Sequence, residues 1–163
     1  MHILVSPESL PRISEPGIYT LLLSLPQPRR IKVGSLGLED YPAGYYCYTG
    51  SARGPGGLKR IDRHIMLSRG QKKTRRWHID YLLPWAGVLE VYITLTALDL
   101  ECRIASDIGR EMRAVPGFGC TDCRCASHLH YAGELSEMKA AAGGAHQRAE
   151  ALLGQCQIQE GQI

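Results

Sequence analysis

The sequence predicts an α/β domain of the α+β kind, in which a small central antiparallel sheet is flanked by helices. Short runs of β-branched, aromatic and aliphatic residues, bounded by Gly and Pro, are typical of strands. Other segments repeat apolar residues every three or four positions, as one face of a helix does. With 163 residues, of which 44% are apolar, the chain is long enough for one domain with a sizeable core.

Three strands are predicted in the first third of the chain. Residues 18–25 and 30–35 are strand-like runs joined by a Pro-Gln-Pro connection, and the second run alternates between apolar and other residues. Residues 36–44 contain glycine and are predicted as a loop. Residues 45–49 are dense in aromatic side chains and form the third predicted strand. We expect the three strands to pair in one antiparallel sheet.

Helices and further strands follow. Residues 58–67 come after a glycine-proline turn and carry apolar residues at helical spacing, so they are predicted as a helix. Residues 77–83 are predicted as a short helical turn that ends at a proline. Residues 88–96 are predicted as a strand, residues 115–125 as a loop, and residues 128–131 as a short last strand.

A second helix is predicted to begin with the capping-box spacing of Thr96 to Asp99 and to end near Met112. On that helix Glu101 lies near the middle of the apolar face. An unpaired carboxylate is costly to bury, so Glu101 should be neutralised, paired with a cation or bound to a metal ion. The alternatives are a partner such as Arg60 or a helix-end position that is open to water.

The predicted domain covers residues 1–132, and residues 133–163 are predicted as a separate tail. The tail is rich in Ala, Gln and Gly. It is expected to hold a helix over 135–153 that is interrupted at residues 143–144, or to be partly disordered.

Positive charge is concentrated between residues 53 and 76, where nine Lys and Arg residues face a single acid, Asp62. The net charge of the whole chain is only +3, so the remainder is acidic on balance. Such asymmetry suits an anionic polymer bound at one face, although a solvated basic surface without a partner is the alternative. The residues expected to contact nucleic acid are Arg53, Lys59, Arg63, Lys72, Lys73, Arg75 and Arg76.

The order of two tyrosines, an arginine, a histidine and an acid resembles the GIY-YIG nuclease family over about residues 16–112. The tyrosines lie in Gly17-Ile18-Tyr19 and Tyr48-Thr49-Gly50, and the other residues are Arg60, His64 and Glu101. The threonine of the second motif replaces the usual Ile or Val. With its strings at 77–81 and 117–125, the chain looks like a poorly characterised archaeal and bacterial branch that is sometimes joined to DNA-repair glycosylase domains.

The resemblance implies hydrolysis of phosphodiester bonds with one divalent cation. Glu101 would hold Mg²⁺ or Mn²⁺, and Arg60 would neutralise the phosphate. Tyr19 would orient or deprotonate the attacking water, which requires nearby positive charge because a free tyrosine has a pKa of about 10. The residues expected to take part in catalysis are Tyr19, Tyr48, Arg60, His64 and, as a second candidate for proton transfer, His78.

A cysteine-histidine cluster is the other candidate site. It consists of Cys120, Cys123, Cys125, His128 and His130. Cys-x-x-Cys followed by histidines can bind structural Zn²⁺, although all these candidates lie on one loop. A glycine-rich loop with incidental thiols is one alternative, and an approach of Asp122 or His128 to the active site is another. Cys47 and Cys102 are expected to pack as small apolar thiols inside predicted elements.

The sequence therefore predicts a cytoplasmic, divalent-metal-dependent endonuclease that acts on DNA in preference to RNA, in repair or in the processing of structured DNA, with a repair protein as a partner. Two alternatives stay open. One is a non-catalytic nucleic-acid-binding module of the same fold, and the other is a zinc-stabilised interaction domain built around residues 120–130. Since no run is long and apolar enough to cross a bilayer, no membrane partner is expected.

Overall fold

The computed structural model describes residues 2–10 and 14–160 and has an α+β fold built on a six-stranded antiparallel sheet, as predicted. The strand order is β1-β6-β2-β5-β8-β7, and β3 and β4 form a separate two-stranded sheet. The strands are β1 (His2–Val5), β2 (Gly17–Leu25), β3 (Arg29–Val33), β4 (Gly37–Tyr41), β5 (Gly44–Ser51), β6 (Gly87–Leu95), β7 (Arg113–Ala114) and β8 (Leu129–Ala132). The helices are α1 (Lys59–Ser68), α2 (Ile79–Leu82), α3 (Glu101–Gly109) and α4 (Leu135–Glu160), with short 3₁₀ turns η1 (Pro7–Ser9), η2 (Gly34–Leu36) and η3 (Leu83–Trp85).

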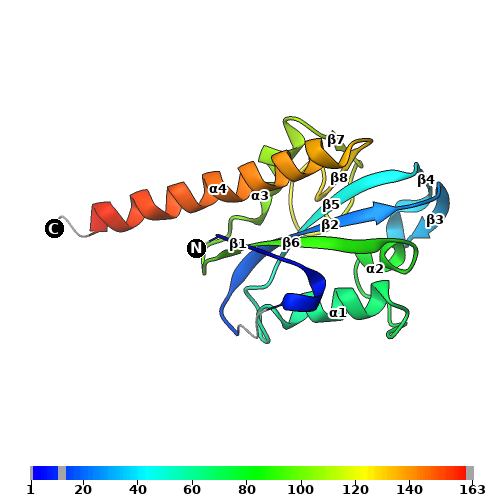
Figure 1. The fold of residues 1–163 in the computed structure, drawn as a ribbon, viewed down its shortest axis with the longest axis horizontal. Coiled ribbons are helices and arrows are strands. Elements are labelled where there is room, and N and C mark those ends of the chain that lie inside the picture. Colours follow the sequence, from blue (N-terminus) through cyan, green and yellow to red (C-terminus); the bar gives the residue numbers. More distant parts are fainter. Residues whose placement is uncertain (1, 11–13, 161–163) are drawn as a thin grey trace.

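Helices cover both faces of the sheet, with α1 and α2 on one side and α3 and α4 on the other (Figure 1). The central strand β2 contributes to a core on each side. Tyr19, Leu21 and Leu23 belong to the core on the α1 and α2 side, whereas Ile18 and Leu22 belong to the core beneath α3 and α4. Successive side chains of a strand point to opposite faces, so a strand covered on both faces appears in the sequence as one continuous apolar run. This explains why β2 was easy to predict.

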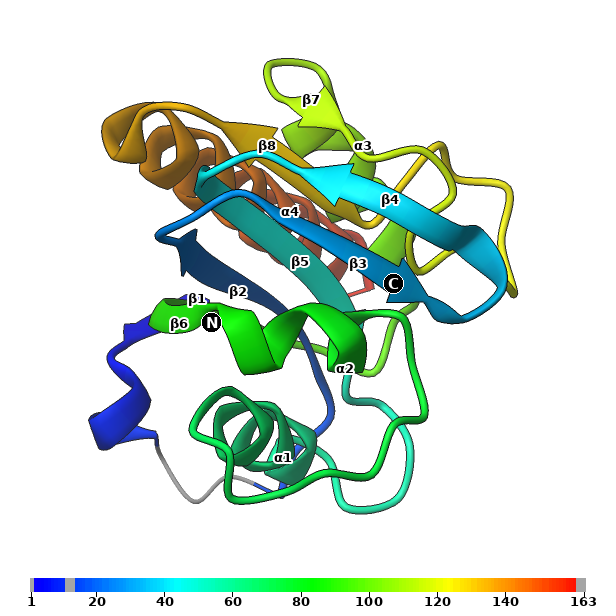
Figure 2. The same ribbon diagram turned by 90° about the vertical axis from the view of Figure 1, so that its right-hand side faces the viewer.

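The predicted three-strand arrangement is wrong in one respect. The second predicted strand, β3, pairs with β4 and not with β2, and β4 lies within the segment 36–44 that was predicted as a loop. Figure 2 shows these two strands running side by side. The turn between them uses Gly37 at a φ of +78°, which favours glycine. The neighbours of β2 in the sheet are instead β5 and β6.

Helix α3 begins later than its capping-box spacing predicted. The hydroxyl of Thr96 accepts a hydrogen bond from the backbone N–H of Leu98 at 3.0 Å, which closes a local turn and does not cap the helix. The helix begins at Glu101. Glu101 therefore lies in the first turn with a side chain that is 24% exposed, and not in the middle of a buried face.

The C-terminal segment predicted as a tail is helical, and its first half belongs to the core. Helix α4 continues through residues 143–144 without interruption. Met138, Ala142 and Ala145 are buried against α3 and the sheet, because small alanine side chains allow the helix to approach closely. The predicted boundary at residue 132 thus falls between two elements of one packed unit. Within the described residues, no helix combines the length and apolarity needed to span a bilayer.

Buried hydroxyls join α4 to the sheet. His146 is fully buried, and its ring nitrogens lie 2.8 Å from the hydroxyls of Thr94 and Thr20. Thr20 is in turn 3.0 Å from the hydroxyl of Thr49. Each hydroxyl thereby satisfies its need for a hydrogen bond inside the core, which explains how a threonine is accommodated between Tyr48 and Gly50.

Candidate functional site

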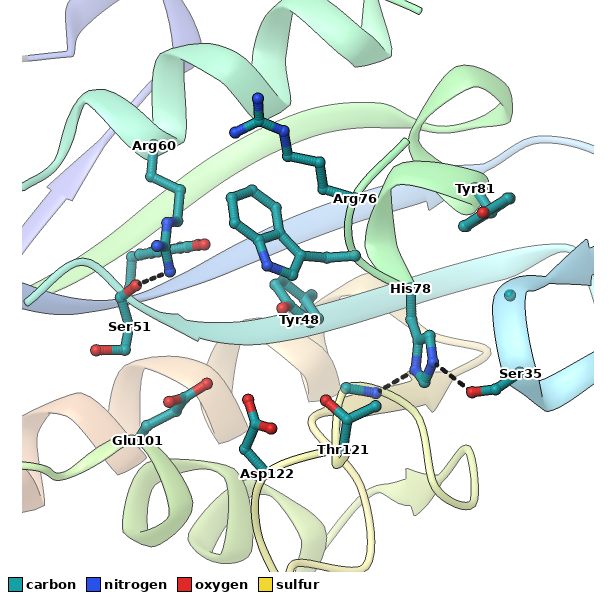
Figure 3. Close-up of a pocket in the computed structure, with 14 residues that line it drawn as sticks. Ser35, Tyr48, Ser51, Arg60, Arg76, His78, Tyr81, Glu101, Thr121 and Asp122 are labelled. Carbon is teal, nitrogen blue, oxygen red and sulfur yellow. Dashed lines mark hydrogen bonds between the residues drawn. The ribbon is translucent and has the colours of Figure 1, made fainter. Parts of the chain in front are cut away.

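A cavity of about 380 Å³ lies where β2 and β5 meet α1, the segment before α2, the start of α3 and the loop before β8. Five of the six residues expected to act in catalysis or metal binding line it, and they are Tyr19, Tyr48, Arg60, His78 and Glu101. Figure 3 shows Arg60 and Arg76 on one side of this pocket and the carboxylates of Glu101 and Asp122 on the other. The fold thus gathers residues from distant parts of the chain into one polar pocket.

The sixth residue, His64, lies directly behind Tyr19. Its Nε2 atom is 2.6 Å from the Tyr19 hydroxyl, and both side chains are buried. On the far side of the ring, Nδ1 lies 3.9 Å from Oδ1 of Asp80. A phenol, an imidazole and a carboxylate therefore follow one another from the pocket into the core.

Burial keeps the first two members of this row, Tyr19 and His64, neutral. It raises the pKa of Tyr19 well above 10, with a further increase from Tyr48, and the nearby Arg60 opposes the shift without reversing it. Burial also lowers the pKa of His64 to about 3, although the Asp80 carboxylate acts in the opposite direction. The positive charge that the general-base role of Tyr19 was expected to need is present in Arg60, but it does not bring the Tyr19 pKa below its ordinary value, because desolvation of the phenolate is the larger effect.

Asp80 is a residue of this site that the sequence analysis missed. It is 0% exposed and accepts two hydrogen bonds from the Arg63 guanidinium, at 2.8 and 2.7 Å. The backbone N–H groups of Arg76 and Trp77 add two more, at 2.7 and 3.0 Å. Burial tends to raise the pKa of Asp80, but these hydrogen bonds outweigh it and lower the pKa. A carboxylate that reaches back from a helical first turn is a capping signal, and this could have identified it.

The pairing corrects the role expected for Arg63. Its side chain is 12% exposed and bound to Asp80, and one nitrogen also donates to the carbonyl of Thr74 at 3.0 Å. A guanidinium whose donors are used inside the protein is poorly placed to contact nucleic acid. Arg63 instead fixes the segment that carries Arg76 and Trp77 into the pocket.

Arg60 is positioned by two contacts at the pocket wall. It donates to the carbonyl of Ser51 at 2.6 Å, and its guanidinium lies 4.6 Å from the centre of the Trp77 ring. A guanidinium has five N–H donors, so several are left for an anion in the pocket. Its charge is therefore held at a defined place beside Tyr19.

His78 connects three segments around the pocket. Its Nδ1 accepts a hydrogen bond from the backbone N–H of Gly119 at 2.9 Å, and its Nε2 lies 3.4 Å from the hydroxyl of Ser35. Burial lowers its pKa, so the ring stays neutral at neutral pH. With Nδ1 used as an acceptor, His78 serves to attach the loop before β8 to the pocket wall.

The remaining basic residues differ in how freely they reach solvent. Arg53 is tied to Asp99 at 3.1 Å and to the carbonyl of Ala97 at 3.1 Å. Arg76 lines the pocket itself. Those that are exposed or half-buried on α1 and the loop after it are Lys59, Lys72, Lys73 and Arg75.

A group of three thiols and one imidazole lies next to Glu101. Its members are Cys102, Cys123, Cys125 and His128, and their ligand atoms all lie within 4.8 Å of one another. Each of these described residues offers one ligand atom, so together they could hold a metal ion. The imidazole also contacts a pocket residue, since Nδ1 of His128 is 3.1 Å from Oε1 of Glu101.

This group differs from the cluster predicted from the sequence. Cys102, expected to be a packing thiol, is a member because it follows Glu101 in the first turn of α3. The thiol of Cys120 instead donates to the carbonyl of Phe118 at 3.4 Å, and the ring of His130 faces Gly109. Asp122 lines the pocket. The proximity of Cys102 depends on how α3 packs, and local spacing contains no signal for it.

Comparison with known proteins identifies a family but no activity. A family model described as "Domain of unknown function DUF123" matches residues 18–151. No curated protein and no solved structure matches the chain significantly. DUF123 is a distinct family, so the resemblance to the GIY-YIG nucleases is wrong. The two tyrosine tripeptides are short, and tyrosines on two adjacent central strands are enough to produce them.

Proposed function

The chain belongs to the DUF123 family, which has no assigned activity, and we propose from the pocket itself that this protein is a divalent-metal-dependent endonuclease that hydrolyses phosphodiester bonds, in DNA in preference to RNA. The observation that carries the proposal is one pocket in which Tyr19, backed by neutral His64, faces the same space as Arg60 and Glu101. These are the groups that phosphodiester hydrolysis needs, namely a route for a proton, a positive charge for the phosphate and a ligand for a cation.

The charge distribution supports a bound phosphate together with a cation. Arg60 and Arg76 lie on one side of the pocket, and Glu101 and Asp122 lie on the other (Figure 3). Carboxylates alone would repel a phosphodiester, and a cation bound between them and the substrate would remove this repulsion. Carboxylate oxygens suit Mg²⁺ or Mn²⁺. Such an ion would supply charge stabilisation for the leaving oxygen.

The buried tyrosine and histidine provide a proton route that does not require a free phenolate. The Tyr19 hydroxyl donates to Nε2 of His64 when the imidazole proton is on Nδ1, facing Asp80. Tyr19 then accepts the proton of an attacking water while its own proton passes to His64. The imidazolium formed lies 3.9 Å from the Asp80 carboxylate, which offsets part of the cost of burying that positive charge. A positioned proton acceptor of this kind contributes roughly 10²–10⁴ in rate.

Arg60 would act on the phosphate. Its guanidinium is fixed by Ser51 and Trp77 before substrate binds. A preorganised positive group loses little free energy in reorganisation as charge builds up on the phosphate oxygens. Nearby, the exposed lysines and Arg75 on α1 and its following loop would guide the polyanion to the pocket.

The two rival functions make different use of the same surface. A binding module would need the basic residues but not a buried hydroxyl paired with a neutral imidazole. A zinc-stabilised interaction domain would use the three thiols and His128, whose donor types suit zinc better than Mg²⁺. Because His128 contacts Glu101, this group of donors adjoins the pocket and does not mark out a separate domain.

The test compares the wild type with Glu101→Gln and Tyr19→Phe on labelled single-stranded, duplex, flap, branched and abasic DNA and on RNA, with Mg²⁺ or Mn²⁺. Glu111→Gln, which changes an exposed acid in the turn just after α3, is the matched control. Loss of a charge-stabilising group costs about 10²–10³ in rate, so both site variants should cut at least a hundredfold more slowly, with binding retained in a fluorescence anisotropy assay. Salt-sensitive binding without cleavage by any of the proteins would instead support the binding module. Equal cleavage by the wild type and Glu101→Gln would refute the assigned site.

A further inference from the structure

We infer that Cys102, Cys123, Cys125 and His128 bind one zinc ion tetrahedrally and that this ion, through His128, positions Glu101 in the pocket. The inference of a metal site depends only on the positions of the four donors. The importance of Glu101 for cleavage rests on the proposed function, and the experiments below keep the two apart.

The distances between the donor atoms match a zinc site. Zinc binds sulfur at about 2.3 Å and imidazole nitrogen at about 2.05 Å, so tetrahedral geometry places a sulfur and a nitrogen donor about 3.6 Å apart. Nε2 of His128 lies 3.5 Å from Sγ of Cys123 and 3.8 Å from Sγ of Cys102. All four donor atoms are within 4.8 Å of one another, so little movement is needed to enclose an ion. Three thiols and one imidazole are also an established combination for structural zinc.

The donors come from two segments that need to be held together. Cys102 lies on α3, whereas the other three lie in or at the end of the loop between β7 and β8. That loop contains little regular structure, and its closure includes backbone hydrogen bonds between residues 117 and 126 and between residues 128 and 118. A zinc ion would join the loop directly to the helix. The loop also carries Asp122, so the same ion would fix a second pocket carboxylate.

His128 uses its two nitrogens for different neighbours. Nε2 faces the thiols, whereas Nδ1 lies 3.1 Å from Oε1 of Glu101. The imidazole is only 3% exposed, and among the described residues its Nδ1 atom has the Glu101 carboxylate as a close contact but no hydrogen bond. A ligating histidine commonly donates its second N–H to a carboxylate, which fixes the ring and the acid together. Binding of the ion at Nε2 would orient the ring and so complete this contact.

The first experiment measures metal content. Protein purified from zinc-containing medium should hold one zinc ion per chain by mass spectrometry of the metal, and Cys102→Ser should lose most of it. Cys120→Ser is the matched control, because Cys120 adjoins Cys123 in the same loop but is not one of the four donors, and it should keep the zinc. Should the cysteine variants fail to fold, cobalt in place of zinc in the wild type still tests the site. The assignment would be overturned if the wild type held no zinc or if its cobalt form lacked the spectrum of tetrahedral thiolate–cobalt. It would also be overturned if Cys120→Ser lost zinc while Cys102→Ser kept it.

The second experiment measures the link to Glu101 without any use of cleavage. Loss of a carboxylate partner of a ligating histidine lowers metal affinity by about 10–100-fold, so Glu101→Gln should release zinc to a chelating dye at correspondingly lower dye concentration. Glu111→Gln should behave as the wild type. An unchanged zinc affinity in Glu101→Gln would refute the positioning role. Failure to cut any nucleic acid would refute the proposed function but leave both metal results intact.

Discussion

The pair formed by Asp80 and Arg63 gives a stability prediction that can be worked out from the structure. Asp80 is 0% exposed and accepts four hydrogen bonds, two from the Arg63 guanidinium and two from the backbone. Asp80→Asn keeps the size of the side chain but removes the charge and turns an amide group toward donors. Removing one partner of a buried ion pair costs roughly 3–5 kcal/mol, because the other charge stays buried without compensation. A typical domain has a free energy of unfolding of roughly 5–15 kcal/mol, so this loss is a large part of the total.

Urea unfolding monitored by tryptophan fluorescence measures this change, since Trp77 adjoins the pair. The matched control is Asp62→Asn, an exposed acid on the same helix as Arg63, which should shift the free energy of unfolding by less than about 0.5 kcal/mol. The double variant Arg63→Met/Asp80→Asn should recover part of the loss, because no unpaired guanidinium is left. A loss below about 1 kcal/mol in Asp80→Asn would refute the assignment of a buried, energetically important pair.

The same pair predicts a pH dependence. The pKa of Asp80 is lower in the folded chain than its unfolded value of about 3.9, so its contribution is complete above that pH. The contribution is lost as pH falls below about 4 and through the folded pKa, where protonation breaks the pair. Acid titration of unfolding free energy should therefore be flatter in Asp80→Asn than in the wild type. Parallel acid profiles for the two proteins would contradict the lowered pKa.

Two further predictions concern the pocket. A Cβ atom on Gly50 would lie 2.5 Å from the Tyr19 hydroxyl, so Gly50→Ala should displace Tyr19 from His64 and slow cleavage. The same change should lower the free energy of unfolding, measured in a urea titration, by about 1–3 kcal/mol. Unchanged stability would mean that Tyr19 is free to move. Arg76 lines the pocket and is exposed, so Arg76→Ala should weaken the binding of labelled DNA. The slope of log affinity against log salt concentration should become smaller in magnitude by about 1. An unchanged slope would mean that Arg76 does not contact the DNA.

Much of the site could be predicted because its residues are marked by local patterns. Tyr19 lies near the start and Tyr48 near the end of runs typical of strands, and these runs are the adjacent strands β2 and β5. Arg60 follows a glycine-rich turn at the start of α1, which places it beside them. Periodicity and turn residues act over a few positions, so they can be read directly from the sequence.

The partners of these residues were harder to predict. Asp80 and Arg63 are separated by 17 positions, so the local capping signal of Asp80 does not reveal its ion pair with Arg63. Cys102 joins the thiols of the later loop only because α3 packs beside β5 and β8. Contacts of this kind depend on which faces are buried against each other, and short sequence windows do not contain that information.

By itself, the sequence determined the α+β class, the strands β2 and β5, the helix α1 and the concentration of positive charge around that helix, because each follows from composition and local periodicity. Only the tertiary structure decided that β3 pairs with β4, that the first half of α4 completes a core, and that Glu101 lies at a pocket beside His128. The physical reason is that a strand or helix can form many alternative contacts of similar local quality. Which of them form is settled by burying both faces of the sheet and satisfying the buried polar groups at the same time.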